Sequence, residues 1–370
     1  GVTELSFTYD DAGLLTTITD KNGLKTTIER DDDGVPGTIV GPFGQRTNVE
    51  IVDGELKSIT DPLDRTVNLE YSDDGLLTKV VSPEGAERVF DYEKDGRLKS
   101  AQDPSGYLET FEPAELPPGV VAGFGNTALK VTTPSGDQTK YTTVQDREGF
   151  HRLIEAADGS KASSTDAITE LPLLFVDGTR SVTQFDADTG FGSQVLIPIS
   201  QTITTPGGRV LETVFQEEKR FEDPKNLLSA TEWQNAVLIN GKASQTSYNR
   251  KDRTIATRSP LGRISTKVLD KDGREIDADV PGFGSTHYDY DGSGRIVAVT
   301  RSAGKETRTQ TYGYDDSDGF LRQVTDALNQ TTTYSPDIAG RLLDVTDPSG
   351  ATVSQTLDGD DRLTLLSLPG

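Results

Sequence analysis

The sequence predicts an all-β fold in which antiparallel β-hairpins, each about 21 residues long, join into one continuous twisted sheet. Three observations predict this fold. Turn residues recur at a nearly constant interval, the segments between them are rich in Thr, Val, Ile and Tyr, and Gly or Pro interrupts the chain about every ten residues. With 37 glycines and 33% apolar residues, the chain suits many short strands, and it is too apolar and aromatic to be disordered.

The first turn of each unit defines the period of the repeat. The steps between successive turn positions are 21, 20, 21 and 21 up to Gly96, and 21, 21, 25, 21 and 21 from Asp252 onwards. These positions are Gly13, Gly34, Gly54, Gly75 and Gly96, then Asp252, Gly273, Gly294, Gly319, Gly340 and Asp361. We attribute the step of 25 to a longer turn at 314–319. A tyrosine often stands four positions earlier, at Tyr9, Tyr71, Tyr92, Tyr248 and Tyr290.

A second turn, typically Asp-Pro-Ser-Gly as at 103–106 and 347–350, closes each unit. Proline presets φ to about −65° at the second turn position, Asp can bond the main chain of its own turn, and Gly at the fourth position accepts positive φ. Two turns per unit leave strands of about five to seven residues. Because one hairpin is marginally stable in water, each hairpin is expected to pair with its neighbours.

The apolar residues after the turn glycine are three apart, as in Leu77 and Val80 or Leu342 and Val345. In a flat strand, residues three apart point to opposite faces. Either a β-bulge intervenes or both faces of the sheet bury apolar side chains. A helix is excluded because these runs are short, rich in Thr and bounded by Gly and Pro.

The repeat pattern predicts three segments: a first repeat block over 1–112, a degenerate spacer over 113–247, and a second repeat block over 248–370. The spacer keeps the turn residues but loses the strict period, and its strongest break is the Pro-Pro-Gly stretch at 115–119. We expect it to continue the sheet.

Composition excludes several classes of function. The net charge is 37 − 60 = −23, which argues against a nucleic-acid surface and against docking on an anionic membrane. No apolar run approaches the roughly 20 residues of a transmembrane helix, and no signal peptide is visible. The chain has no cysteine, so disulfides and thiolate chemistry are absent. It begins and ends inside repeat units, so we expect a piece of a longer protein.

The unit of tyrosine, acidic turn, glycine, Arg or Leu strand and Asp-Pro-x-Gly turn resembles the YD repeat of the RHS (rearrangement hotspot) family. The best-matching units are at 9–112 and 248–366, and the stretch from Asp177 to Arg209 resembles the degenerate spacer between YD blocks. Bacterial RHS toxins, Tc-toxin cocoon subunits and the YD barrels of teneurins belong to this group.

The resemblance implies a spiralling β-ribbon that forms part of a hollow shell, which in the toxins encloses a C-terminal effector polypeptide and in teneurins mediates adhesion. It implies a secreted or cell-surface location of bacterial type. The segment that closes the toxin shells and cleaves the effector has no counterpart here, and neither does a variable toxin tail. The chain is therefore expected to form part of a shell wall, without sealing it.

No catalytic site is predicted. Only two histidines occur, and His287, with Asp289 two positions on, is the better candidate for a general base; His151 is the other. A strand histidine without catalytic function explains both. No Gly-x-Ser-x-Gly nucleophile motif is present, and 60 acidic residues make chance pairs of carboxylates common.

No cofactor or metal is predicted either. The acidic runs at 31–33, 315–318 and 358–361 could offer oxygen ligands to Ca²⁺, but they fall on repeat turns and match no twelve-residue calcium loop. Three Gly-Phe-Gly motifs, at 123–125, 190–192 and 282–284, lack the third glycine of a nucleotide loop, and the Asn329 glycosylation motif is attributed to chance.

Aromatic side chains offer the remaining candidate site. Tyrosines that recur once per hairpin are expected to form a structural cross-strand ladder, although they and the single Trp233 could stack on sugar rings. We therefore expect a non-catalytic section of a shell that encloses or presents a toxin or effector polypeptide. The alternative is a surface adhesin that binds a glycan or a protein, and an enzyme acting on polysaccharide is the least favoured hypothesis.

Overall fold

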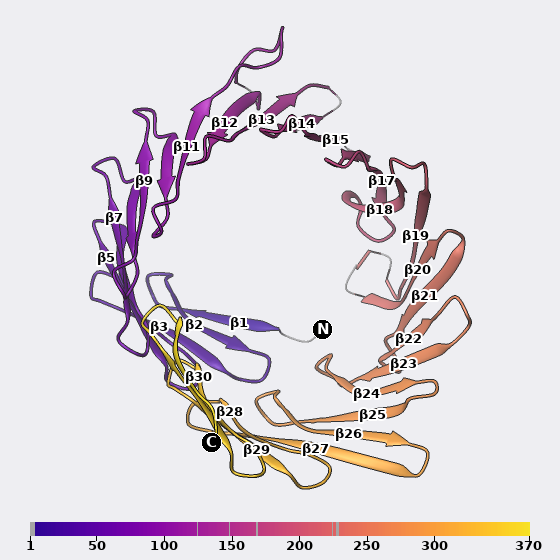
Figure 1. Cartoon of the computed structure of the whole chain (residues 1–370). Helices are drawn as coiled ribbons and strands as arrows, with labels where there is room; N and C mark the ends of the chain where they lie inside the picture. The colour runs from indigo at the N-terminus through magenta and orange to yellow at the C-terminus, as the bar shows by residue number, and fades with distance from the viewer. Residues whose placement is uncertain (1–3, 124, 148, 168, 224, 227–228) are drawn as a thin grey trace. The chain divides into compact units, whose positions relative to one another are not determined.

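The computed structural model describes residues 4–123, 125–147, 149–167, 169–223, 225–226 and 229–370. Its 32 strands belong to one antiparallel sheet, and the described residues contain no α-helix (Figure 1). The prediction of an all-β fold built from antiparallel hairpins is confirmed. The described residues include no helix able to cross a membrane.

The chain forms two compact units, one from 1–90 together with 269–370, and one from 91–268. The first unit contains β1 (Leu5–Tyr9), β2 (Leu15–Asp20), β3 (Lys25–Arg30), β4 (Pro36–Val40), β5 (Arg46–Val52), β6 (Glu55–Thr60), β7 (Thr66–Tyr71), β8 (Leu77–Val81), β24 (Glu275–Val280), β25 (Gly284–Tyr290), β26 (Ile296–Ala303), β27 (Glu306–Tyr314), β28 (Leu321–Thr325), β29 (Thr331–Pro336), β30 (Leu342–Thr346), β31 (Thr352–Leu357) and β32 (Leu363–Ser367).

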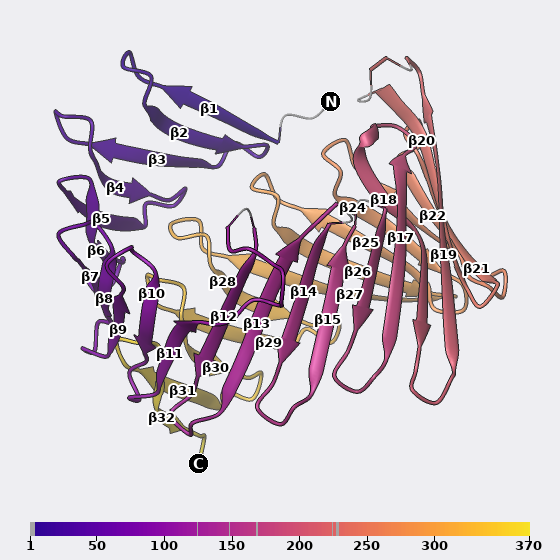
Figure 2. The same ribbon diagram turned by 90° about the horizontal axis from the view of Figure 1, so that it is seen from above.

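The second unit contains β10 (Leu98–Gln102), β11 (Leu108–Pro113), β12 (Thr127–Thr132), β13 (Gln138–Gln145), β14 (Phe150–Glu155), β15 (Lys161–Asp166), β16 (Glu170–Leu174), β17 (Arg180–Asp188), β18 (Gly192–Thr204), β19 (Val210–Phe221), β20 (Ala230–Ile239), β21 (Lys242–Asn249) and β22 (Thr254–Arg258). The two boundaries between the units, at 90–91 and 268–269, fall within strands β9 (Glu87–Tyr92) and β23 (Ile264–Leu269). Figure 2 shows β13, β14 and β15 side by side in one layer. The three segments predicted from the repeat pattern remain a prediction.

Most repeat turns share one geometry, which explains their sequence. In the turn that begins at Asp10, the Gly13 N–H donates to the Asp10 carbonyl at 3.0 Å, and the Asp10 carboxylate accepts bonds from the N–H groups of Ala12 and Leu14. Gly13 has a φ of 80°, which favours glycine. Where glycine is replaced at this position, Asp64, Asn329 and Asp361 have φ values of 60°, 60° and 64°, because Asp and Asn tolerate this conformation best among other residues.

Three turns differ from their sequence interpretation. Gly54 lies in a two-residue turn with Asp53, which is one residue shorter than the common turn and explains the step of 20. The turn after Tyr248 is one residue longer than expected, and Arg253, not Asp252, has the positive φ. The step of 25 is only partly due to the turn at 315–319, since β26 and β27 are also longer than the strands of regular units.

A β-bulge in each regular hairpin explains the apolar pairs that are three positions apart. Tyr71 pairs with Leu77 and Leu69 pairs with Val80, and the register shifts by one residue between Glu70 and Tyr71. Because Leu69 and Tyr71 are two apart, they share a face, and so do their partners Leu77 and Val80. The same shift occurs in the hairpins β1–β2, β5–β6, β25–β26 and β29–β30.

The bulge therefore gives each regular hairpin one apolar face, with Leu, Ile, Val and Tyr, and one polar face. Residues such as Glu70 and Lys79, which pair with each other, lie on the polar face. Neither face is packed as a core, because Ala236 is the only hydrophobic side chain in the buried set of the described residues. The apolar side chains stay half-buried, as Leu69 and Val80 do, or exposed, as Phe7 and Tyr9 are.

Within the first unit, the N-terminal and C-terminal segments contact each other through their turns. Lys21 Nζ donates to the Asp272 carbonyl at 2.7 Å, and Gln45 Nε2 donates to the Asp318 carbonyl at 2.8 Å. Arg65 Nη1 lies 2.5 Å from Asp361 Oδ1. The first two of these polar contacts join turns that lie 251 and 273 positions apart in the sequence.

Candidate binding surfaces

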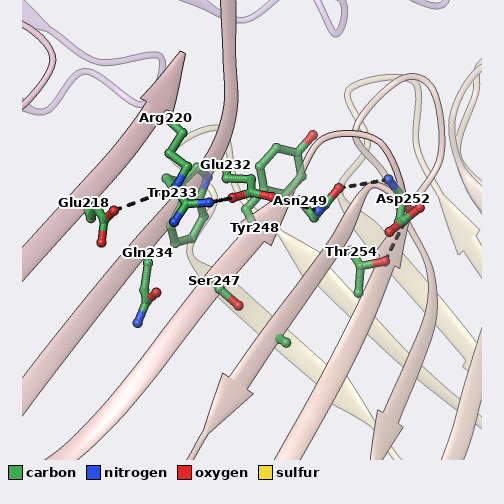
Figure 3. A pocket seen from close by; sticks show the side chains of 11 residues that line it. Glu218, Arg220, Glu232, Trp233, Gln234, Ser247, Tyr248, Asn249, Asp252 and Thr254 are labelled. Atoms are coloured by element: carbon green, nitrogen blue, oxygen red, sulfur yellow. Dashed lines mark hydrogen bonds and ion pairs between the residues drawn. The ribbon is translucent and has the colours of Figure 1, made fainter. Parts of the chain in front are cut away.

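A polar pocket of the second unit lies on β19–β22 and has a volume of about 390 Å³ (Figure 3). Its lining includes a cross-strand row in which Arg220 pairs with Glu232, Glu232 with Asn249, and Asn249 with Thr254. Arg220 Nη1 lies 3.1 Å from Glu232 Oε2, and Asn249 Nδ2 donates to Glu232 Oε1 at 3.4 Å. The row presents alternating donors and acceptors, which suits hydroxyl or amide groups.

Trp233 and Tyr248 pair directly across β20 and β21, and their rings stack with centroids 6.0 Å apart and an angle of 24° between the planes. Both residues border the pocket. Since side chains alternate along a strand, their rings nevertheless project from the face opposite to that of Glu232 and Asn249, so the polar row and the aromatic pair form separate surfaces. Both residues are half-buried. The structure thus brings together the single tryptophan and one of the repeat tyrosines.

An ion-pair cluster lies beside this aromatic pair. Lys219 pairs with Trp233 across the strands, and its Nζ lies 2.7 Å from both Asp188 Oδ2 and Glu217 Oε1. Asp188 also accepts bonds from the N–H groups of Gly190 and Phe191. Burial alone would raise the pKa of Asp188, but the hydrogen bonds from Lys219 and the two N–H groups outweigh it and lower the pKa to about 2.

Asp188 is only 5% exposed, so this cluster fastens the β17–β18 turn to β19. Sequence reasoning missed the cluster. The residues are 31 positions apart in the sequence, and no local pattern predicts that this turn folds back onto β19.

Each histidine contacts acidic or hydroxyl groups. His287 Nδ1 lies 2.8 Å from Asp277 Oδ1 and its Nε2 lies 3.3 Å from Asp289 Oδ1, so both ring nitrogens face carboxylates. The hydrogen bond to Asp277 raises the pKa of His287 most. His151 lies between Thr165 and Asp146, at 3.1 Å and 3.0 Å. This arrangement favours a charged His287 that links neighbouring strands, and it leaves no free ring nitrogen for a substrate.

The acidic runs serve as turn caps. The first aspartate of each run accepts main-chain N–H groups of its own turn, as Asp31, Asp315 and Asp358 do. Within the described ranges, no three His, Asp or Glu side chains are grouped as metal ligands. The structure gives no support to a calcium site in these turns.

The Gly-Phe-Gly motifs at 190–192 and 282–284 and Asn329 also lie at turns. Phe124, the centre of the first motif, lies outside the described residues. Phe191 lies under Lys219, at 5.5 Å from its Nζ to the ring centroid, and Phe283 is exposed with its N–H donating to the Val280 carbonyl at 2.9 Å. Asn329 occupies the fourth position of the turn between β28 and β29.

The repeat residues have two kinds of environment. The turn glycines of the repeat, Gly13, Gly34, Gly54, Gly75, Gly96, Gly273, Gly294, Gly319 and Gly340, have φ values from 76° to 85°. Among the tyrosines, Tyr248 stacks on Trp233, whereas Tyr290 lies under the Arg274 guanidinium at 4.8 Å and donates its hydroxyl to the Glu275 carbonyl at 2.7 Å.

The arginine that follows a turn glycine is therefore part of the repeat, and sequence reasoning missed this role. Arg295 donates from Nε to Asp291 at 2.7 Å, lies 4.5 Å above the Tyr314 ring, and Tyr314 donates its hydroxyl to the Ile296 carbonyl at 3.0 Å. The signal was available, because an arginine follows the turn at 274, 295, 341 and 362. Tyr9 and Tyr71 lie elsewhere: Tyr9 is exposed, and the Lys57 ammonium lies 5.0 Å from the centre of the Tyr71 ring.

Comparison with known proteins gives a consistent family. The profile of the Teneurin YD-shell family matches residues 1–370. Teneurin-4 of Homo sapiens is 29% identical over 153 residues, which are 40% of this chain and 5% of that protein. Teneurin-3 of Danio rerio is 23% identical over 341 residues, which are 89% of this chain and 12% of that protein. The chain thus spans about a tenth or less of the length of these teneurins.

Solved structures share the fold. The crystal structure of TcdB2-TccC3 without its hypervariable C-terminal region matches with a TM-score of 0.56 and 14% identity, over 98% of this chain and 22% of that chain. The Photorhabdus luminescens Tc holotoxin pore matches with a TM-score of 0.54 and 14% identity, over the same shares of the two chains.

Proposed function

We propose, from the premise that this chain belongs to the Teneurin YD-shell family, that it is a non-catalytic wall section of a secreted or cell-surface shell that encloses or presents an effector polypeptide. The observation that supports this function is the apolar face. In each regular hairpin the bulge gathers apolar side chains on one face, and these side chains are half-buried, as in β7–β8, or exposed, as in β1.

A sheet face that leaves apolar side chains half-buried or exposed favours contact with apolar groups of another polypeptide. In the second unit, Tyr141, Ile154 and Ala162 form one register row, and a cavity of about 280 Å³ lies against them. The opposite face at this point carries Lys140, Glu155 and Lys161. An unfolded segment, which exposes apolar side chains, is the kind of polypeptide that such a face retains.

Fluorescence anisotropy with a permanently unfolded, labelled polypeptide tests the proposal. We expect saturable binding, which Ile154→Asp weakens because it puts a charge on the apolar face. Lys140→Gln, on the polar face of the neighbouring strand, is the matched control and should bind as the wild type does. Absence of saturable binding, or equal losses in the two variants, would contradict the proposed function.

A surface adhesin is the second candidate, favoured by the near-parallel stacking of half-buried Trp233 and Tyr248. Aromatic pairs of this kind can pack against the apolar faces of sugar rings. Because Trp233 is the only tryptophan, its intrinsic fluorescence reports on this place alone. A saturable change with a soluble glycan, lost in Tyr248→Ala and kept in Tyr107→Ala, would support the adhesin. If no glycan of a broad panel changes the Trp233 fluorescence, the adhesin function would be contradicted.

A further inference from the structure

Strand β27 has an open edge inside the sheet, and this feature is independent of the proposed function. On one side, β27 pairs with β26 from Glu306↔Ala303 to Thr311↔Ala298. On the other side, it pairs with β28 only from Thr311↔Thr325 onwards. Residues 306–310 are therefore paired along one edge only, because β28 has five residues and β27 has nine.

The open edge borders a cavity of about 730 Å³. All five residues from Glu306 to Gln310 line it, and the turn between β28 and β29, with Asp326, Ala327 and Leu328, closes one end. The space thus continues the line of β28 beyond Thr325, where the chain turns away. An extended segment of about five residues fits along such an edge.

The main chain of this edge points outward at two positions. Ala303 and Glu306 flank the two-residue turn of Gly304 and Lys305, so they form a hydrogen-bonded pair and direct their N–H and C=O groups inward. The pattern alternates along an antiparallel ladder, which leaves the N–H and C=O groups of Thr307 and Thr309 facing the cavity.

Two arginines give the edge its charge preference. Arg301 and Arg308 pair directly across β26 and β27, an arrangement of like charges that is unfavourable unless an anion compensates it. Arg308 has only a long contact with Glu306, at 3.5 Å, and within the part of the chain that the structure describes Arg301 makes no ion pair. Asp326, the other acid at the cavity, caps its own turn by accepting the N–H groups of Leu328 and Gln330.

We propose that the open edge of β27 at 306–310 binds an extended acidic peptide segment as an added antiparallel strand, with a carboxylate side chain opposite Arg308. Main-chain bonds to Thr307 and Thr309 would hold the segment. The two guanidinium groups would select an acidic side chain at the middle of it, since this position continues the Arg301–Arg308 row.

Anisotropy titration of the whole chain with a fluorescent, end-capped pentapeptide, Thr-Val-Glu-Val-Thr, tests this site. We expect saturable binding, and binding about fivefold weaker for the same peptide with Lys in place of Glu. Arg308→Gln should weaken binding of the Glu peptide by a similar factor and should not weaken binding of the Lys peptide, whose ammonium group it frees from a like charge. Equal affinities for the two peptides, or no effect of Arg308→Gln, would overturn the proposal.

A second pair of measurements tests the strand geometry. Thr309→Pro removes one outward N–H and leaves the bonds to β26, so it should weaken binding about tenfold. A peptide with N-methyl groups on the residues that face Thr307 and Thr309 gives the same test with the protein unchanged. Undiminished binding of the methylated peptide would show that no strand is added. Displacement of the peptide by sulfate at constant ionic strength would reduce the site to an adventitious anion site and overturn it too.

Discussion

The two units of the molecule use the same strands and turns in different ways. In the first unit, most strands have five to seven residues and successive turns repeat the Asp–Arg arrangement, as at Asp270–Arg274 and Asp291–Arg295. In the second unit, β18 and β19 have 13 and 12 residues, and a buried ion pair fastens one turn back onto the sheet. Short repeats distribute the stabilising contacts evenly, whereas long strands concentrate them at a few side chains.

The largest effect is expected where the contacts are concentrated. Asp188→Ala leaves Lys219 without its buried partner and deprives two N–H groups of their acceptor, so it should lower the free energy of unfolding by about 3 kcal/mol. Urea unfolding followed by Trp233 fluorescence measures this loss. Asp32→Ala, in an exposed repeat turn, is the control, and a loss of similar size there would erase the contrast between the units.

The same carboxylate should give the second unit an acid-sensitive transition. The pKa of Asp188 is about 2 in the folded chain, below its ordinary value of 3.8. The stabilisation is therefore present above about pH 4 and is lost as the pH falls towards 2. We expect the wild type to lose stability in this range and Asp188→Ala to lose less. Parallel pH curves for the two proteins would contradict the assignment.

A smaller effect is expected in the first unit, where the contacts are distributed. Arg295→Ala removes the ion pair with Asp291 and the stack on Tyr314, and it should cost about 2 kcal/mol. Arg362→Ala is the matched control, since Arg362 makes the same Nε contact with Asp358 but is 62% exposed and stacks on no ring that the structure describes. Urea unfolding should show a clearly smaller loss of stability for Arg362→Ala than for Arg295→Ala, because solvent screens an exposed ion pair. Equal losses would show that the ring stack contributes little.

A substitution in a single repeat turn should lower the free energy of unfolding by still less. Gly273 has a φ of 79° and open space where a Cβ would lie, so Gly273→Ala should cost about 1 kcal/mol through backbone strain alone. Gly273→Asn should cost clearly less, because Asn329 already adopts this conformation in another turn. Thermal unfolding of the two variants compares them. If Asn costs as much as Ala, the strain explanation of the turn is wrong.

The smallest effect concerns His287. Its pKa is raised, mainly by the hydrogen bond with Asp277, so its contribution to stability is present at acidic pH and is lost as the pH rises through the folded-state value. Asp277→Asn should lower the pKa of His287, because it removes the carboxylate that faces Nδ1. Titration of the His287 imidazole by NMR in the wild type and the variant measures this change. An unchanged pKa of His287 would assign the shift to another group.

The regular hairpins could be predicted from the sequence because their information is local. The turn residues set φ within four positions, and the period of 21 fixes which residues are equivalent. The bulge could be predicted only as one of two alternatives, since the apolar spacing of Leu77 and Val80 does not reveal the register of the partner strand. The Trp233–Tyr248 pair depends on strand pairing over 15 positions, and the Asp188–Lys219 pair depends on a turn that folds back over 31 positions. No repeat pattern encodes either contact.

The open edge of β27 could not be predicted from the repeat pattern either. The step of 25 between Gly294 and Gly319 was visible in the sequence, but its interpretation as a longer turn missed the longer strands on either side of Gly304 and Lys305. Strand length depends on how far neighbouring strands continue to pair, and this follows from the whole sheet rather than from the segment itself.

A bulge gathers apolar residues three apart on one binding face, and thiol labelling tests this arrangement most directly. The chain has no cysteine, so single-cysteine variants at Leu77, Lys79 and Val80 each report on one position. We predict that an unfolded polypeptide protects the cysteines at 77 and 80 from a thiol reagent and leaves the one at 79 reactive. Protection at 79, or opposite behaviour at 77 and 80, would contradict the account.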